Sequence, residues 1–384
     1  MEATDSPDPT ELGGDYVFKK KLKVDQGMEH EIELEPEQEK QSSEGLAGLM
    51  EEVYSPKKYQ ILKEIGHGTF GVVFKAKNTE SSTTVAIKKT AQDPRNTNRE
   101  FTILAKIDHP NCLKLISYYF TKEPQSAGPK VPTKLDDEDL PKVQRSSPDE
   151  EEPLVDFLNL VTDYYNENLY SIMDFYRKLS KGSSGPKKGL PHALVKLYSY
   201  QILRALNYLQ QKKIVHRDLK PSNILIDTKS QRLILADLGS AKEVVLVQSE
   251  RDPSQVTIER SVSYIVSRYY RAPELILGQE YYGYKVDLWS VGCIIAEMFL
   301  GHPLFMGKSS QDQLFRIASV LGKIGKLEKG AMNEHYSGPL PEIETDTQLG
   351  KILESVGADR YGIDLLTKIL VYDPAQRIDP MEAL

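Results

Sequence analysis

The most restrictive feature of the sequence is a polar stretch enclosed by apolar runs. Residues 216–223 read His-Arg-Asp-Leu-Lys-Pro-Ser-Asn, and the apolar runs 214–215 and 224–226 flank them. Such runs predict short strands, so the polar residues should form a loop that is held at both ends. A third apolar run, 233–236, leads into Asp-Leu-Gly at 237–239, which begins fourteen residues after the polar stretch ends. The chain must therefore fold so that ordered elements present two polar loops.

Four side chains of these loops have the chemistry that phosphoryl transfer requires. Asp218 is suited to accept or orient the proton of a hydroxyl nucleophile, and Lys220 to neutralise the phosphoryl group in transfer. The amide oxygen of Asn223 and the carboxylate of Asp237 are hard oxygen ligands, which Mg²⁺ prefers. We therefore predict Asp218 and Lys220 as catalytic residues, and Asn223 and Asp237 as metal ligands.

A glycine-rich stretch, Gly-His-Gly-Thr-Phe-Gly at 66–71, joins two predicted strands, 59–65 and 72–76. Taken alone, this pattern fits an ordinary hairpin turn about as well as a nucleotide-binding loop. Its position between two strands indicates a hairpin that could lie close over a triphosphate, because a dinucleotide-binding motif would instead open a helix.

Lys88 lies within a third predicted strand, 84–89, and Glu100 follows twelve positions later in a predicted helix, 96–107. A partly buried ammonium that holds nucleotide phosphates needs a carboxylate to keep it charged and oriented. A strand lysine and a helix glutamate can provide such a pair. Two unrelated surface charges are the alternative.

The hydrophobic pattern divides the chain into a strand-rich front half and a helical rear half, which predicts an α+β fold with two lobes. Further strands are expected at 113–120 and 154–161, a helix after Pro191, and a buried helix at 286–300. Ala-Pro-Glu at 272–274 precedes that buried helix. We expect Arg377 to be the partner of Glu274.

Charge is distributed unevenly along the chain. The formal net charge is −7, but residues 1–55 contribute −10 and residues 122–153 contribute −4, which leaves +7 for the remainder. High charge with few large apolar residues predicts that 1–55 is an acidic, disordered tail, and 122–153 an acidic surface insertion. Residues 59–384 then form one domain, with an N-lobe at 59–162 and a C-lobe at 166–384.

Two cysteines, Cys112 and Cys293, lack the spacing of a metal site, and the longest apolar run is interrupted by Glu297. The N-terminal residues do not resemble a secretory signal. We expect a cytoplasmic protein, with the nucleus as an alternative location. We expect neither nucleic acid nor a membrane as a partner.

In this order and spacing, the motifs resemble the signature of eukaryotic protein kinases over about residues 59–384. Ser-Arg-Tyr-Tyr-Arg-Ala-Pro-Glu at 267–274 is similar to the group that includes cyclin-dependent, mitogen-activated and glycogen synthase kinases. Three further segments, 98–100, 237–242 and 262–268, resemble the glycogen synthase kinase 3 (shaggy-like) family. Because such domains usually continue beyond a point like residue 384, we expect a truncated C-lobe.

This resemblance implies a bilobal kinase fold, ATP and Mg²⁺ as cofactors, and transfer of the γ-phosphoryl group to serine or threonine of protein substrates. The residues that match the ATP-binding positions of the family are Ile65, Gly66, His67, Gly68, Thr69, Phe70, Gly71, Val72, Val73, Lys88, Glu100, Asp163 and Tyr165.

The resemblance also implies a cationic pocket formed by Arg99, Arg217 and Lys242. In the family this pocket binds a phosphate already present on the substrate, four residues C-terminal to the target residue. Tyr264 matches the phosphorylated tyrosine of the activation segment. Pre-phosphorylated proteins are the expected substrates, and scaffold proteins are further candidate partners.

The sequence departs from the family in the segment between Lys242 and Tyr264, which is longer. It contains Ser254, Thr257 and Ser261, any of which could fill the pocket if phosphorylated. Two alternative functions stay open: a proline-directed kinase of the mitogen-activated or dual-specificity tyrosine-regulated type, and a pseudokinase scaffold.

Overall fold

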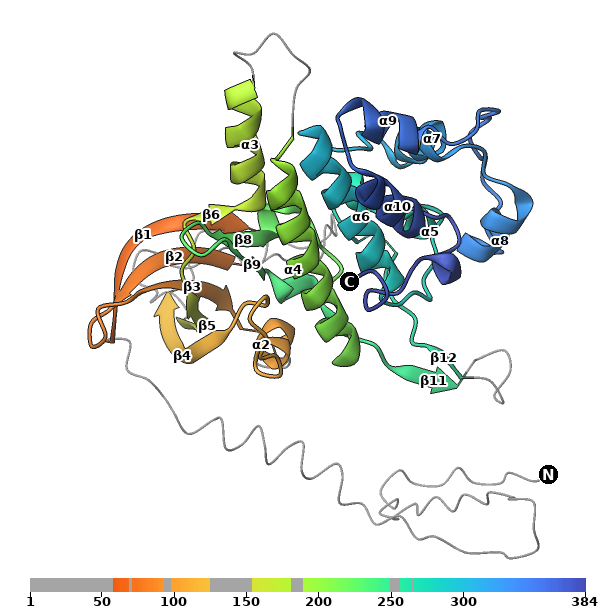
Figure 1. Ribbon diagram of the computed structural model, residues 1–384. Helices are drawn as coiled ribbons and strands as arrows, with labels where there is room; N and C mark the ends of the chain where they lie inside the picture. Colours follow the sequence, from red (N-terminus) through yellow and green to blue (C-terminus); the bar gives the residue numbers. More distant parts are fainter. Residues whose placement is uncertain are drawn as a thin grey trace, which may run out of the picture. The chain divides into compact units, whose positions relative to one another are not determined.

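The computed structural model describes residues 58–68, 71–92, 98–124, 154–180, 189–248, 256–263 and 265–384. Its N-terminal part is a single antiparallel sheet with the strand order β1-β2-β3-β5-β4 (Figure 1). The strands are β1 (Tyr59–Gly68), β2 (Gly71–Asn78), β3 (Thr84–Ala91), β4 (Leu115–Pro124) and β5 (Leu154–Asp163). The strands expected in this part of the chain are confirmed, and β4 pairs with β5. The predicted tail and most of the acidic insertion lie outside the described residues.

Alternation of side chains along β3 gives the sheet two different faces. Val85 and Ile87 are buried on one face, where they pack with Ala76 and Val161. Successive residues of a strand point to opposite faces, so Lys88 lies on the other side. Lys88 is therefore directed away from this small apolar cluster by the strand itself.

The helix α2 (Arg99–Leu104) is shorter than the sequence predicts. It begins after Asn98, whose side-chain oxygen accepts a hydrogen bond from the backbone N–H of Phe101 at 3.0 Å. This N-cap satisfies a helix donor that has no partner within the helix. The helix ends at Leu104, several residues before Pro110. The apolar residue Ile107, which the sequence pattern included in the helix, therefore lies beyond its end. Glu100 lies in the first turn and is buried.

The C-terminal part is mostly helical, as expected, and its helices surround one largely buried helix, α6 (Lys285–Leu300). Every residue from Val286 to Leu300 is buried, which confirms the predicted core helix. Figure 1 shows α6 beside α4 (His192–Gln211), and the two helices are in contact. The other helices are α3 (Leu169–Ser180), α5 (Pro273–Ile276), α7 (Ser310–Leu321), α8 (Lys326–Asn333), α9 (Leu349–Ser355) and α10 (Arg360–Ile369).

Short strands fix the loops between the sheet and the helices. β8 (Ile224–Asp227) pairs with β6 (Glu167–Asn168) and β9 (Arg232–Leu235), and β7 (Ile214–Val215) pairs with β10 (Lys242–Glu243). The polar loop 216–223 is therefore held between two strands, as predicted. A hairpin that the sequence analysis did not anticipate, β11 (Leu246–Gln248) with β12 (Val256–Ile258), projects from the helical part (Figure 1).

A buried ion pair joins α5 to a residue near the end of the chain. The guanidinium of Arg377 donates two hydrogen bonds to the carboxylate of Glu274, at 2.6 and 2.7 Å. The side chains are 0% and 2% exposed. The predicted pairing of these two residues is confirmed.

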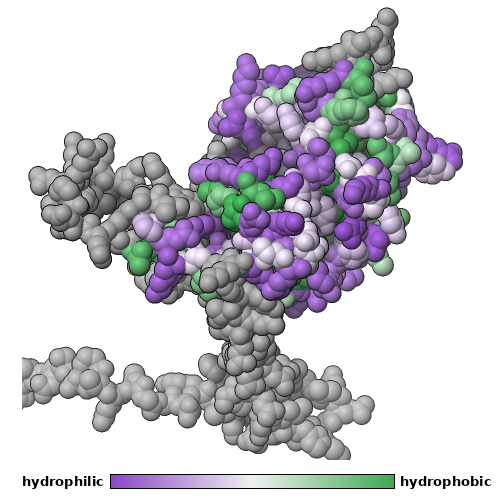
Figure 2. Space-filling view, turned by 90° about the vertical axis from the view of Figure 1, so that its left-hand side faces the viewer, coloured by the Kyte–Doolittle hydropathy of each residue, from purple (hydrophilic) through white to green (hydrophobic). Residues whose placement is uncertain are grey.

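The surface is largely hydrophilic, with apolar side chains gathered in small patches on the face shown in Figure 2. Exposed apolar residues on β1 include Ile61, Leu62 and Ile65. Within the described ranges, no helix has both the length and the apolar character that a membrane-spanning segment requires.

Candidate active site

A cleft of about 540 Å³ is lined by residues from both the sheet and the helical part. This volume is within the range of small-molecule sites. Nine of the residues predicted to bind ATP line the cleft: Ile65, Gly66, His67, Gly71, Val73, Lys88, Glu100, Asp163 and Tyr165. Val72 is buried and does not line it, Gly68 is the last residue of β1, and Thr69 and Phe70 lie outside the described residues.

The turn between β1 and β2 requires glycine at one position. Gly71 has a φ of +141°, and a Cβ atom placed there would lie 2.3 Å from the carbonyl oxygen of Lys89. No other residue can take this conformation without moving the neighbouring strand. The glycine at position 71 therefore has a structural cause, because it lets the start of β2 lie close to the β3 backbone.

Lys88 is paired with two carboxylates inside the cleft. Its Nζ lies 2.8 Å from Oε2 of Glu100 and 3.0 Å from Oδ1 of Asp237. Burial alone would lower the pKa of Lys88, but the negative charges of Glu100 and Asp237 outweigh it, so the pKa is raised. Burial would raise the pKa of Asp237, but the Lys88 charge outweighs this effect and the pKa is lowered. The ammonium therefore stays charged and is aimed at the cleft by β3, α2 and the loop after β9.

Both oxygens of the Asp218 carboxylate are held by neighbouring groups. Oδ2 accepts from Nζ of Lys220 at 2.6 Å and from Nδ2 of Asn223 at 3.1 Å. Oδ1 accepts from the backbone N–H and the hydroxyl of Ser267, both at 3.2 Å. The structure thus brings the two predicted catalytic residues into direct contact. It adds Ser267, a site residue that the sequence analysis did not identify.

The loop that carries Asp218 is anchored by Asp287 of α6. Asp287 is buried, and its two carboxylate oxygens accept the backbone N–H groups of His216 at 2.6 Å and Arg217 at 2.9 Å. Arg217 has a φ of 67°, a left-handed conformation that is unfavourable for a residue with a side chain. The buried carboxylate therefore holds a strained loop one residue before Asp218.

The residues predicted as metal ligands fit a hard divalent cation. Nδ2 of Asn223 donates to the backbone oxygen and the carboxylate of Asp218, at 2.8 and 3.1 Å, and these two groups can only accept. The amide oxygen of Asn223 is therefore directed away from them. Both Asn223 and Asp237 line the cleft, and Mg²⁺ prefers such oxygen ligands.

Two of the three predicted phosphate-binding cations lie at a second, smaller hollow. Arg217 and Lys242 line this hollow, and Nε of Arg217 donates to the carbonyl oxygen of Ser240 at 2.7 Å. Arg99 is exposed at the start of α2 and does not line it. The charge of Arg99 nevertheless contributes, after Lys242, to a lowered pKa of Glu259 at the same hollow. Tyr264 lies outside the described residues.

Three residues that make these contacts were not predicted as site residues. Ser267 belongs to the segment 267–274, which carries the family resemblance, and Asp287 lies in the predicted core helix 286–300. Their positions therefore signal a role, although the contacts do not follow from them. Glu259 has no such signal, because it lies in the part of the chain that departs from the family.

Comparison with known proteins agrees with this architecture. Residues 59–384 match the protein kinase domain family. The chain is 38% identical over 327 residues to protein kinase gsk31 of Schizosaccharomyces pombe, covering 85% of this chain and 74% of that protein. Protein kinase gsk3 of the same yeast is also 38% identical, with 85% and 72% covered. Glycogen synthase kinase 1 of Pyricularia oryzae is 37% identical, with 85% and 71% covered.

The family resemblance read from the motifs is thereby confirmed. The sheet, the helical part and the cleft lined by residues of both have the arrangement expected of a kinase, and the family match covers residues 59–384. The chain belongs to the protein kinase family and, within it, to the serine/threonine kinases related to glycogen synthase kinase 3.

Proposed function

We propose that this kinase phosphorylates serine or threonine residues of proteins that already carry a phosphate four residues C-terminal to the target. As a protein kinase, the chain uses ATP and a metal ion and acts on protein substrates. The observation that carries the finer proposal is that Arg217 and Lys242 line one hollow, close to the loop of Asp218. Cations gathered in this way repel one another, so an anion of suitable geometry lowers their energy.

In the loop 216–223, we assign Asp218 to the substrate hydroxyl. Its carboxylate orients the hydroxyl and accepts its proton as the oxygen attacks the γ-phosphorus and the bond to ADP breaks. Lys220, at 2.6 Å from Asp218, is suited to neutralise the charge that develops on the phosphoryl oxygens. Lys88 would hold the nucleotide phosphates, and Asn223 and Asp237 would hold the metal ion, which offsets phosphate charge.

Arg99→Ala tests the preference for phosphorylated substrates. The measurement is kcat/KM for two peptides that differ only in whether the serine four residues after the target carries a phosphate. Loss of one charge-assisted contact predicts a decrease of about 10- to 100-fold for the phosphorylated peptide alone. Arg316→Ala, which removes a partly exposed arginine of α7 paired with Asp312, is the matched control. An equal decrease for both peptides in Arg99→Ala would contradict the proposal.

Asp218→Asn separates an active kinase from a pseudokinase scaffold. The amide keeps the shape of the carboxylate but cannot accept the proton, so phosphoryl transfer should be abolished while the melting temperature stays close to that of the wild type. Wild-type protein without transferase activity would favour the scaffold. Appreciable turnover in the purified variant would exclude the assigned role of Asp218.

The backbone beside Ser267 supports a second candidate specificity, a preference for proline after the target residue. Val266 has a φ of 64°, and its carbonyl oxygen accepts from Nη2 of Arg271 at 2.9 Å in a buried bond. This carbonyl is turned inward, so it is not available to a substrate N–H group. Proline has no backbone N–H, so a substrate with proline after the target residue leaves no donor without a partner at this position. Peptides with proline or alanine after the target test this candidate, and equal rates would count against it.

A further inference from the structure

The predicted phosphate pocket already contains an anion from the chain itself. Nζ of Lys242 lies 2.7 Å from Oε2 of Glu259. The same ammonium is 3.0 Å from the hydroxyl oxygen of Ser261 and 3.3 Å from the backbone oxygen of Arg260. An ammonium has three donors, and residues 259–261 supply three acceptors. A phosphate that binds Lys242 must therefore displace at least one of them.

Backbone hydrogen bonds hold Glu259 at this position. Glu259 directly follows β12, and its N–H donates to the carbonyl oxygen of Val245, which directly precedes β11, at 2.8 Å. Two residues later, the N–H of Ser261 donates to the carbonyl oxygen of Glu280 at 2.8 Å. The hairpin and the second contact fix both sides of Glu259, so the side chain reaches Lys242 from an ordered backbone.

Charge favours the ionised form of Glu259. A hydrogen bond from Lys242 and then the charge of Lys242 lower the pKa of its carboxyl group. Desolvation opposes them, and the charge of Arg99 adds a further lowering effect, so the pKa is lowered. Arg217 lines the same hollow as Glu259 and Lys242. Lys242 and Arg99 thus act electrostatically on the carboxylate of Glu259, and Arg217 lines the same hollow.

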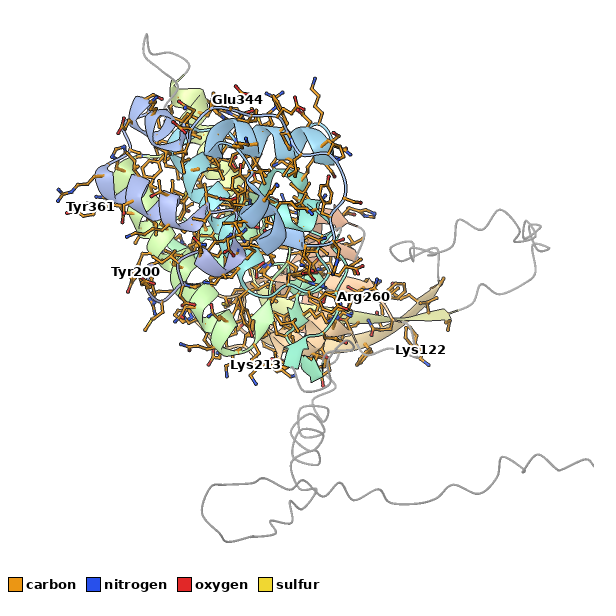
Figure 3. The ribbon with its side chains drawn as sticks, turned by 90° about the vertical axis from the view of Figure 1, so that its right-hand side faces the viewer. Lys122, Tyr200, Lys213, Arg260, Glu344 and Tyr361 are labelled. Carbon is orange, nitrogen blue, oxygen red and sulfur yellow. The ribbon has the colours of Figure 1, made fainter. Side chains whose placement is uncertain are left out.

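The neighbouring residue, Arg260, points elsewhere. It is labelled in Figure 3, where its side chain projects at the surface, and its Nε pairs with Oε2 of Glu280 at 2.7 Å. The side chain of Arg260 is 68% exposed. The segment therefore directs its acidic residue to the pocket, and its basic residue to another carboxylate.

We propose that Glu259 is a built-in anion of the phosphate pocket and competes with the substrate phosphate for Lys242. This inference rests on the proposed preference for phosphorylated substrates and adds a residue that sets its strength. A phosphoserine carries a charge of about −1.5 to −2 and three acceptor oxygens, against one charge and two oxygens for a carboxylate. A substrate phosphate can therefore displace Glu259, but it binds more weakly than it would to an empty pocket.

The test is Glu259→Gln, which keeps the size of the side chain and removes its charge. Because Glu259 is partly exposed, its pairing with Lys242 is of moderate strength, and its removal should lower KM for the phosphorylated peptide by up to about fivefold. KM for the unphosphorylated peptide and kcat for both peptides should not change. Without ATP, the Kd of the phosphorylated peptide measured by fluorescence anisotropy should fall by the same factor.

The matched control is Glu280→Gln. It breaks the ion pair with Arg260 in the same segment without removing a contact of Lys242. Its two KM values should equal those of the wild type.

The outcomes separate this inference from the proposed function. If Arg99→Ala selectively impairs the phosphorylated peptide but Glu259→Gln leaves its KM and Kd unchanged, the pocket stands and the role of Glu259 is refuted. If Glu259→Gln changes both peptides equally, Glu259 acts through the general structure of the segment, which also refutes competition. If Arg99→Ala affects both peptides equally, the proposed preference itself fails.

Discussion

Replacing Asp287 with asparagine should weaken the anchor of the catalytic loop without changing the size of the side chain. Each oxygen of the Asp287 carboxylate accepts one backbone N–H, from His216 at 2.6 Å and from Arg217 at 2.9 Å. Asparagine keeps one acceptor but places an NH₂ group against the other N–H. Two donors then face each other in a buried site, where water cannot easily satisfy them.

The magnitude follows from this geometry. A hydrogen bond to a charged group contributes about 1.5–3 kcal/mol, and a buried N–H without a partner costs about 1–3 kcal/mol. Because one such bond is lost and relaxation recovers part of the cost, we expect a loss of about 3 kcal/mol in the free energy of unfolding. For a domain of this size, such a loss lowers the melting temperature by about 4 °C.

The same change should reduce kcat, because relaxation of the strained Arg217 backbone displaces Asp218, the next residue. A displacement of about 1 Å can cost about 100-fold in rate. KM for ATP should stay close to the wild-type value, since Asp287 does not line the cleft. The sharpest signature is therefore a loss in kcat with little change in KM.

Thermal unfolding and steady-state kinetics on one protein preparation provide the assay. Asp312→Asn is the control, because Asp312 also accepts a backbone N–H, from Lys308 at 2.7 Å, but does so at the surface. The control should lose less than about 1 kcal/mol. If Asp287→Asn matched the wild type in both melting temperature and kcat, the proposed anchoring role would be refuted.

Three further changes test other parts of the structure. Arg377→Met leaves the carboxylate of Glu274 buried and unpaired, so we expect chemical denaturation to show a decrease of about 3–5 kcal/mol in the free energy of unfolding. A decrease below about 1 kcal/mol, as for an ion pair at the surface, would refute the reasoning. Burial raises the pKa of Glu297 to about 7. The protonated carboxyl group therefore stabilises the folded protein fully below the ordinary pKa of 4.5, and this contribution is lost as the pH rises through 7. Relative to Glu297→Gln, the wild type should therefore lose about 3 kcal/mol between pH 5 and pH 8, and parallel pH profiles of the melting temperature would contradict this prediction. Glu100→Gln removes one of two charged partners of Lys88 and should lower kcat/KM for ATP by about 10- to 100-fold. Unchanged binding of a fluorescent nucleotide would exclude the role of Glu100 in positioning Lys88 for the nucleotide phosphates.

Much of the fold was predictable because its signals are local. The five strands of the sheet, the helix after Pro191 and the core helix α6 each have the hydrophobic period of their structure within a few residues. The end of α2 was not predictable in the same way, since apolar residues continue to Ile107 after the helix has ended. The β11–β12 hairpin has only three residues in each strand, too few for a clear alternation.

The site was predictable as a set of residues but not as a set of contacts. Lys88 and Glu100 are twelve positions apart on adjacent elements, so their pairing follows from the local pattern. The contact of Lys88 with Asp237 joins residues 149 positions apart and depends on the packing of the helical part against the sheet. The approach of Glu259 to Lys242 is also tertiary, because the path of the hairpin decides where the carboxylate lies.

The pair of Glu274 and Arg377 also affects the order of events during synthesis. The two residues are 103 positions apart, so at about 5–20 residues per second Arg377 is made on the order of 5–20 s after Glu274. Until then, burying Glu274 would leave an unpaired carboxylate in the core, at a cost of several kcal/mol. The region around α5 should therefore stay open on the ribosome for this interval, and the last step in closing the helical part should wait for a residue that is translated long after the catalytic loop.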